Sequence, residues 1–562
     1  MPHIEEYSPD WDTPAAAKER RRSSLSRRNS SVWLASAAMD SQGPSRAVSR
    51  CPSGWNLTGL TPLTPLTPVI PHKKKRSLDS LPQEILTIIL QYVVSSDTGP
   101  ADLCRLLATC GRIYDLGVAM LYRHVVFRTP HAFDKFRWSI EGTGYGQHVR
   151  VFDFSAFTSV GLGRTKRMNS EIQMVTASTI RRALDLCSQL VEFLAAESID
   201  TDLDAAVLDQ LLTMPVLQTL DFCGATAPQF IEQLHGSLVM QQDFSFYTLT
   251  KLSLHCCNTI PAETLTAFLS KCPNLTRLDV THTQLTDEAL HAVPPTVQLT
   301  HLSLSRCVRV SNHSVVRFLV LHPACKKLKW LNLMFEATKP NPLGHRDIDT
   351  ILRFLPKGMT YLNIYGQKVT DDLLQLIDTS KLRSLWLGYT QVTMKGLEHF
   401  LPSCRSLKFV NLSGIPSIST WTLKSQEFQN LSSTVDMFEF SPETLDKLAK
   451  MRGFFVFQGR GRRCWLFRSK DKVLEREQSQ HNLRQTSFSF GQVALDRINA
   501  RNQARRPMVQ VQQTEKPPPS WDPIWRYASV KVNVSLIGLG NVSSPAIYGN
   551  EGFYNYYAYH NI

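Results

Sequence analysis

Residues 275–290 read LTRLDVTHTQLTDEAL, and residues 299–319 read LTHLSLSRCVRVSNHSVVRFL. Both stretches open with apolar residues in the pattern L-x-x-L-x-L, which predicts a short strand. Both continue into a polar residue, Thr286 or Ser311, followed by apolar residues at helical spacing. A polar residue in that place caps a helix. One strand and one helix therefore form one structural unit.

The same unit recurs along the chain, which is typical of a repeat protein. From Leu190 to Leu407 the opening residue advances by about 27 residues per step on average. The strand patterns are Val149/Phe152/Phe154, Leu190/Phe193/Ala195, Leu217/Leu220/Phe222, Leu249/Leu252/Leu254, Leu275/Leu278/Val280, Leu299/Leu302/Leu304, Leu328/Leu331/Leu333, Met359/Leu362/Ile364, Leu382/Leu385/Leu387 and Leu407/Val410/Leu412. We expect an α/β solenoid over residues 145–420, with parallel strands inside and helices outside.

One position of the repeat carries a recurrent small or polar residue. Cys257 and Cys307 each stand three residues after the last apolar residue of a strand pattern, and Thr283, Gln367 and Thr390 hold that place elsewhere. The array thus resembles the cysteine-containing leucine-rich repeat, a type often joined to an F-box. A segment from Phe335 to Arg346, rich in Pro and Asn, is read as an insertion in one unit.

Side chains alternate along a strand, so the residues between the leucines face the concave surface. In the last repeats these residues include several large apolar side chains: Trp330, Met334, Tyr361, Tyr365, Trp386 and Phe409. A contiguous aromatic patch has the composition of a protein-binding hot spot. The alternative is that the C-terminal segment folds back and covers it, and the sequence favours neither.

Residues 77–126 form a short helical module with more apolar surface than so few residues can bury alone. Leu81-Pro82-x-Glu84-Ile85-Leu86-x-x-Ile89-Leu90, then a gap, Asp102-Leu103 and Leu107-x-x-Cys110 resemble the F-box. The resemblance implies docking onto the Skp adaptor of a cullin–RING ubiquitin ligase. The adaptor-binding residues it implies are Leu81, Pro82, Glu84, Ile85, Leu86, Ile89, Leu90, Leu103, Leu107, Cys110, Leu121 and Tyr122. The alternative is a helical cap on the repeats.

The flanks differ from this core in charge. The chain of 562 residues has a net charge of +14, which is concentrated in residues 1–76 and 452–512, while residues 77–451 are nearly neutral. A folded nucleic-acid module would carry the basic residues itself, so nucleic acid is not an expected partner. We expect residues 1–76 to be a disordered basic tail. Its candidate phosphorylation sites are Ser24, Ser30, Thr61, Thr64 and Thr67, and Lys73–Arg76 is a candidate import signal or a solvated linker.

We expect the C-terminal region to contain three parts: a cap at 421–468 that includes a hairpin, a disordered linker at 469–520, and an aromatic tail at 521–562 that docks on the solenoid or binds a partner. The 12 cysteines form no C-x-x-C pair, so neither metal nor cofactor is expected. The N-terminus lacks the apolar stretch of a signal peptide and no apolar run reaches 18 residues, so we expect a cytoplasmic or nuclear protein without a membrane partner.

The leading hypothesis is therefore a non-catalytic, substrate-recognition subunit of an SCF-type ubiquitin ligase. A second hypothesis is a scaffold outside a ligase, for instance in nuclear or transcriptional assemblies. A third is a GTPase activator that uses Arg277 on the concave face. No H-E-x-x-H motif, P-loop or nucleophile elbow supports an enzyme.

Overall fold

The computed structural model describes residues 78–94, 99–127, 129–155, 157, 174–240, 245–335, 343–418, 428, 435–441, 444, 454–458, 464–468 and 531–532. The basic N-terminal tail with its five candidate phosphorylation sites, the linker at 469–520, most of the insertion and most of the aromatic tail lie outside these residues.

The first described segment is a module of three helices, α1 (Gln83–Val94), α2 (Gly99–Leu107) and α3 (Gly111–Arg123), preceded by one 3-10 turn, η1 (Leu78–Ser80). Leu90, Leu103 and Leu107 pack with Ile113 into a small core. Gly117 lets α3 come close, because a Cβ there would lie 2.5 Å from Leu107 Cδ2. Hence the module has a small core of its own.

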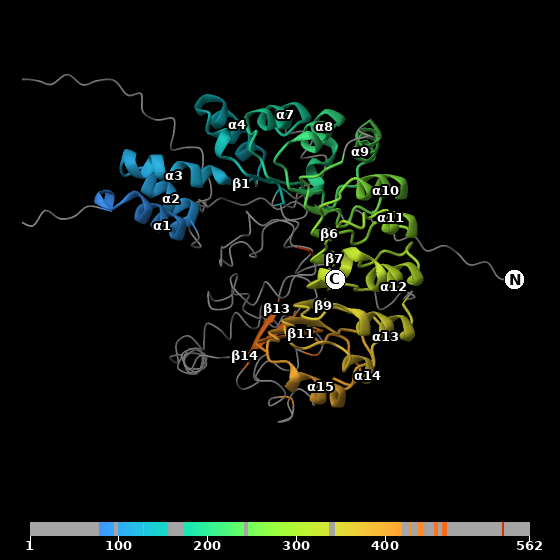
Figure 1. Ribbon diagram of the computed structural model, residues 1–562. Coiled ribbons are helices and arrows are strands. Elements are labelled where there is room, and N and C mark those ends of the chain that lie inside the picture. Colours follow the sequence, from blue (N-terminus) through green and yellow to red (C-terminus); the bar gives the residue numbers. More distant parts are fainter. Residues whose placement is uncertain are drawn as a thin grey trace, which may run out of the picture. The chain divides into compact units, whose positions relative to one another are not determined.

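A sheet of short strands follows (Figure 1). Its strands are β1 (His124–Val126), β2 (Val151–Asp153), β3 (Glu192–Leu194), β4 (Thr219–Asp221), β5 (Lys251–Ser253), β6 (Arg277–Asp279), β7 (His301–Ser303), β8 (Trp330–Asn332), β9 (Tyr361–Asn363), β10 (Ser384–Trp386), β11 (Phe409–Asn411), β12 (Met437–Phe440), β13 (Phe454–Gln458) and β14 (Cys464–Arg468). The strand order is sequential from β1 to β12, and each neighbouring pair is parallel. This confirms the expected α/β solenoid.

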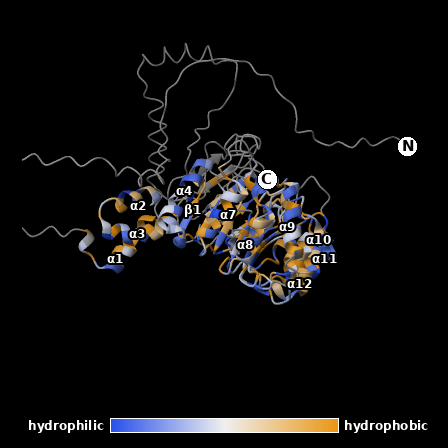
Figure 2. Ribbon diagram, turned by 90° about the horizontal axis from the view of Figure 1, so that it is seen from above, coloured by the Kyte–Doolittle hydropathy of each residue, from blue (hydrophilic) through white to orange (hydrophobic). Residues whose placement is uncertain are grey.

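The helices lie along one side of the strand stack (Figure 1). They are α4 (Pro130–Thr143), α7 (Ala177–Leu186), α8 (Ala205–Thr213), α9 (Pro228–Met240), α10 (Ala262–Ser270), α11 (Asp287–His291), α12 (Asn312–Leu321), α13 (His345–Phe354), α14 (Asp371–Leu374) and α15 (Met394–Phe400), with 3-10 turns η2 (Tyr145–His148), η3 (Glu197–Asp202), η4 (Pro323–Lys327) and η5 (Leu401–Ser403). The middle residue of each parallel strand from β2 to β12 faces them and is buried in one continuous core, as Leu278 and Leu302 are. Figure 2 shows apolar and polar residues interspersed through the repeats.

Polar caps begin the helices as the repeat pattern predicts. Thr286, Ser311 and Thr393 are the N-caps of α11, α12 and α15, and each side chain accepts a hydrogen bond from the backbone N–H three residues on. Two of these caps are also joined to an Asp of the preceding repeat: Ser311 Oγ donates to Asp287 at 2.7 Å and Thr393 Oγ1 donates to Asp371 at 2.6 Å. The caps therefore link neighbouring repeats as well as their own helices.

The cysteine position of the repeat has a similar linking role. Cys257 Sγ donates to the Phe222 carbonyl at 3.0 Å, and Cys307 Sγ donates to the Val280 carbonyl at 3.1 Å. In both cases the acceptor lies in the preceding repeat. Thr283 and Thr390 instead donate to carbonyls of their own repeats, Val280 and Leu387. A cysteine at this place is thus a structural donor.

The expected hairpin extends the sheet at its far end. β14 pairs antiparallel with β12, and β13 pairs antiparallel with β14. Trp465 on β14 lies opposite Glu439 on β12 and is buried. Among the described residues no helix is both long and apolar enough to cross a bilayer.

Candidate functional site

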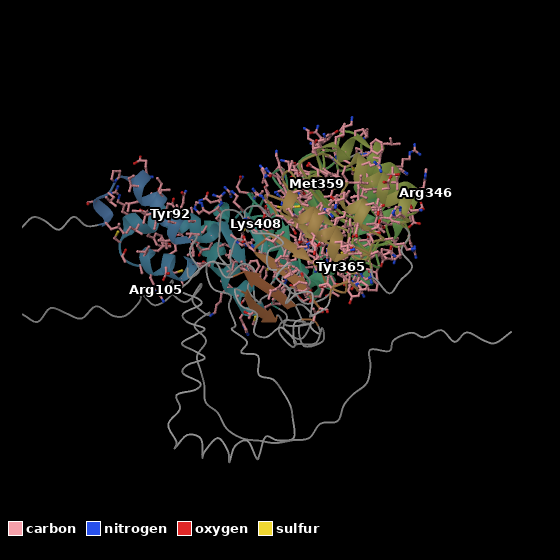
Figure 3. All side chains as sticks on the ribbon, turned by 90° about the horizontal axis from the view of Figure 1, so that it is seen from below. Tyr92, Arg105, Arg346, Met359, Tyr365 and Lys408 are labelled. Carbon is pink, nitrogen blue, oxygen red and sulfur yellow. The ribbon has the colours of Figure 1, made fainter. Side chains whose placement is uncertain are left out.

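The first candidate site is the outer face of α1. Its apolar side chains stand at helical spacing and are open to water: Ile85 is 45% exposed, Ile88 48% and Tyr92 76%. Pro82 at the start of the helix and Leu78 in η1 are exposed as well. Figure 3 labels Tyr92 on the module. We call Leu78, Pro82, Ile85, Ile88 and Tyr92 the α1 outer face.

The residues that the F-box resemblance selects differ in their exposure to water. Leu86, Leu90, Leu103 and Leu107 are buried inside the module, and Leu81, Ile89, Cys110 and Leu121 are half-buried. Only Pro82, Glu84 and Ile85 of that set are exposed. Sequence reasoning missed Leu78, Ile88 and Tyr92, although Ile88 and Tyr92 follow Ile85 at i+3 and i+7, on the same face of a helix.

Tyr122 has a different place from the other members of the set. Its hydroxyl lies 2.5 Å from Ser139 Oγ on α4, and its ring lies 5.1 Å from that of Tyr145. The ring also packs on the solenoid core. Tyr122 therefore joins α3 to the first repeat, and Tyr114 adds a second link through its hydroxyl, 2.6 Å from that of Tyr145.

The second candidate site is the concave face of the sheet. Strand register aligns the aromatic residues as expected: the rings of Trp330 and Tyr361 stack 4.2 Å apart, and those of Trp386 and Phe409 lie 5.1 Å apart. Yet Trp386 and Phe409 are 0% exposed, Trp330, Met334 and Tyr361 are buried, and Tyr365 is half-buried. The aromatic residues are thus buried within the chain, which agrees with the alternative that the chain itself covers them. Target binding by these six residues stays a prediction.

The last residue of the strands forms another row on the concave face, with a common hydrogen bond. In Asp153, Asp221 and Asp279, Oδ1 accepts the backbone N–H two residues further on, at 2.9 to 3.0 Å. Oδ1 of Asn332, Asn363 and Asn411 makes the same bond at 3.0 to 3.1 Å. We call β2–β6 the acidic half and β8–β11 the amide half of the concave face.

The acidic half contains a segment of the C-terminal tail. Lys531 Nζ lies 2.6 Å from Asp221 Oδ2, and the backbone N–H of Val532 donates to Asp279 Oδ2 at 2.9 Å. Lys531 is 1% exposed and Val532 is 0% exposed. The sequence left open whether the tail docks on the solenoid. Residues 531–532 do dock, on the acidic half.

Two more cations neutralise carboxylates in the acidic half. Lys251 Nζ lies 3.6 Å from the buried Glu192, and His255 Nδ1 lies 3.2 Å from Asp279 Oδ2. Burial acts to lower the pKa of His255, but the negative charges of the Cys256 thiolate and the Asp279 carboxylate outweigh it and raise this pKa to about 10. Burial likewise acts to raise the pKa of Asp279, yet His255 holds it below its usual value. Both groups are therefore charged at neutral pH.

Strand β7, which lies between the acidic half and the amide half, contains His301. Burial, together with the charges of Arg277 and Lys329, lowers the pKa of His301 to about 3. Arg277 lies between Lys251 and His301 in the strand register, so its neighbours on the sheet are cationic or neutral. In the described part of the chain, no three His, Cys, Asp or Glu side chains are grouped so as to hold a metal ion.

No family model matches the chain. Among solved structures, the complex of Rad7 and Elc1 from yeast is similar with a TM-score of 0.41 and 11% identity, over 63% of this chain and 87% of that one. The leucine-rich-repeat protein LegL7 from Legionella pneumophila gives a TM-score of 0.29 and 14% identity, over 45% of this chain and 83% of that one.

One curated relative matches about two thirds of the chain. It is the F-box protein YLR352W of Saccharomyces cerevisiae, 27% identical over 470 residues, which cover 68% of this chain. The match spans 57% of the relative's own length. The resemblance to F-box proteins, expected from the helical module, is thus confirmed by a curated relative that is named an F-box protein.

Proposed function

We propose that the protein is the substrate-recognition subunit of an SCF-type ubiquitin ligase. The α1–α3 module binds a Skp-type adaptor, and through it cullin and RING subunits, while the repeats bind the protein to be ubiquitinated. The chain itself catalyses no covalent step. The similarity to a curated F-box protein supports this role.

The observation that carries the proposal is the α1 outer face. A module with its own small core leaves Ile85, Ile88 and Tyr92 in water, on one side of one helix. Exposed apolar side chains grouped in this way are typical of a protein-binding surface, and large aromatic and aliphatic side chains at the centre of an interface contribute most of the affinity.

The test is co-purification of the adaptor with full-length variants. Ile85→Glu should reduce adaptor binding at least tenfold, because it places a charge in the contact, and Leu81→Ala with Pro82→Ala should abolish it. Leu321→Glu is the matched control, since Leu321 on α12 is 68% exposed and distant in sequence from the module. Equal adaptor binding by Ile85→Glu and Leu321→Glu would contradict the proposal, and adaptor binding without cullin would favour a scaffold.

Regulation of the N-terminal tail belongs to the same proposal. Ser24, Ser30, Thr61, Thr64 and Thr67 lie near basic or proline residues that kinases recognise, and Lys73–Arg76 could direct the protein to the nucleus. We expect phosphate at some of these five positions in cells under growth or stress. Phosphopeptide mapping that finds all five unmodified under both conditions would count against it, as would unchanged nuclear entry after Lys73–Arg76 are replaced by alanine.

A further inference from the structure

The acidic half of the concave face has charge that the fold itself does not require. Asp221 and Asp279 accept backbone N–H groups through Oδ1, and neutral Asn332 and Asn363 make that same bond in the amide half. An amide therefore suffices for the turn. The negative charge of Asp221 must have another purpose, because a buried carboxylate is costly unless a cation pairs with it.

The cation that pairs with Asp221 comes from far along the chain. Within the described residues, Lys531 is the cationic group within 4 Å of Asp221, and it lies 310 positions away in sequence. Glu192 and Asp279, by contrast, have partners within the repeats, Lys251 and His255. Asp221 thus depends on a lysine that the solenoid does not supply.

Two contacts with the tail use groups that many sequences offer. They are made by the ammonium group of Lys531 and by the backbone N–H of Val532, which every residue except proline has. A lysine in an extended segment of another protein offers the same two groups. The acidic half is consequently suited to recognise a lysine together with the main chain that follows it.

We propose that the acidic half of the concave face is the recognition site for a lysine-containing extended segment of the target protein, and that Lys531 and Val532 occupy this site in the free chain. The tail is then an intramolecular competitor of the target. This inference rests on the proposed function, since it identifies the chemistry by which the repeats recognise their target.

The test uses the full chain and a fluorescent peptide with the sequence of residues 526–537, RYASVKVNVSLI. Binding is measured by anisotropy to the wild type, to Lys531→Ala, and to Lys531→Ala combined with Asp221→Asn. The Lys531→Ala chain should bind the peptide at least tenfold more tightly than the wild type, because its own tail no longer fills the site. Adding Asp221→Asn should remove most of that binding.

Matched controls distinguish lysine recognition from non-specific binding. A peptide with alanine in place of the lysine should bind the Lys531→Ala chain at least tenfold more weakly, and a peptide that keeps Lys-Val but shuffles its other residues should bind within about threefold. Lys516→Ala, which changes another lysine of the C-terminal region, should behave as the wild type. Thermal melting checks that Asp221→Asn still folds, and Asp279→Asn is the second variant if it does not.

Each outcome has a definite reading. Equal binding of the lysine and alanine peptides, binding that is unchanged by Asp221→Asn, or no binding to the Lys531→Ala chain would overturn the inference. The last result would make the tail a structural clamp in its own chain only. Adaptor binding is measured on the same variants: its presence alongside failed peptide recognition rejects the inference alone, and its absence from the wild type rejects the proposed function instead.

Discussion

The acidic and amide halves of the concave face have one backbone arrangement and two different surroundings. In both, the last strand residue accepts the N–H two residues on. In the amide half the neighbours are Trp330, Tyr361 and Trp386, which are buried together. In the acidic half the neighbours are charged groups and residues 531–532 of the tail. The Asp and Asn side chains therefore stabilise the repeats in both halves, whereas the negative charge of Asp221 and Asp279 serves the contact with the tail.

The largest expected effect lies in the amide half. Trp386→Ala should lower the free energy of unfolding by about 3–5 kcal/mol, because it removes a fully buried aromatic side chain. Urea denaturation measures this, with Trp386→Phe as a milder control. A Trp386→Ala chain of unchanged stability whose target has a longer half-life would contradict this structural role, since it would make the aromatic row a binding surface.

Replacing the amide of the amide half by a carboxylate tests whether charge distinguishes the two halves. Asn363→Asp should destabilise the chain by about 1–3 kcal/mol at pH 7, because it buries a charge among aromatic rings. Burial raises the pKa of such a carboxyl above the unfolded value of about 4, so the penalty is present at neutral pH and fades as the group is protonated in acid. Denaturation at pH 7 and pH 4 measures both. An equal cost at the two pH values would mean that shape, and not charge, distinguishes the halves.

His301 on strand β7 should make the free energy of unfolding depend on pH. The pKa of His301 is lowered to about 3 in the folded chain, against about 6.5 when unfolded. Its contribution is therefore intact above pH 6.5 and is lost as the pH falls toward 3, with a slope of at most about 1.4 kcal/mol per pH unit. His301→Gln should flatten stability between pH 6 and pH 4 relative to the wild type. Identical pH profiles would show that His301 is solvated.

The smallest expected effect is that of Ser303→Ala on the same strand. Ser303 Oγ lies 2.6 Å from Thr281 Oγ1 in a buried place, so the change should cost about 0.5–1.5 kcal/mol. Lys531 and Val532 are bonded to Asp221 and Asp279, whose side chains this change leaves in place, so docking of the tail should persist. Hydrogen exchange at Val532 follows this directly. Faster exchange there would mean that any damage to the concave face releases the tail.

The sequence allowed prediction of the features that repeat locally. The leucine spacing predicted the strands and their parallel order, and the polar residues before two of the helices predicted the caps at Thr286 and Ser311. These features depend on residues within one repeat or in adjacent repeats, so a periodic pattern records them. The alignment of Trp330 and Tyr361 followed for the same reason.

Burial and contacts between distant residues could not be predicted in this way. Nothing in the local pattern around Trp386 records that it is 0% exposed. The pairing of Lys531 with Asp221 depends on one lysine 310 positions away. A signal did exist for the acidic half: the change from Asp to Asn at one repeat position is visible in the sequence, and it points to charge as the variable.

The sequence separation between the tail and its site also delays docking of the tail during synthesis. Val532 is made 253 residues after Asp279. At about 5–20 residues per second, the ribosome needs roughly 10 to 50 s to cover that distance, and repeats can fold meanwhile because each one depends on its neighbours. During that interval the nascent acidic half has no tail to fill it. A nascent chain therefore encounters other lysine-containing proteins, including other nascent chains, before its own C-terminal tail has been synthesised.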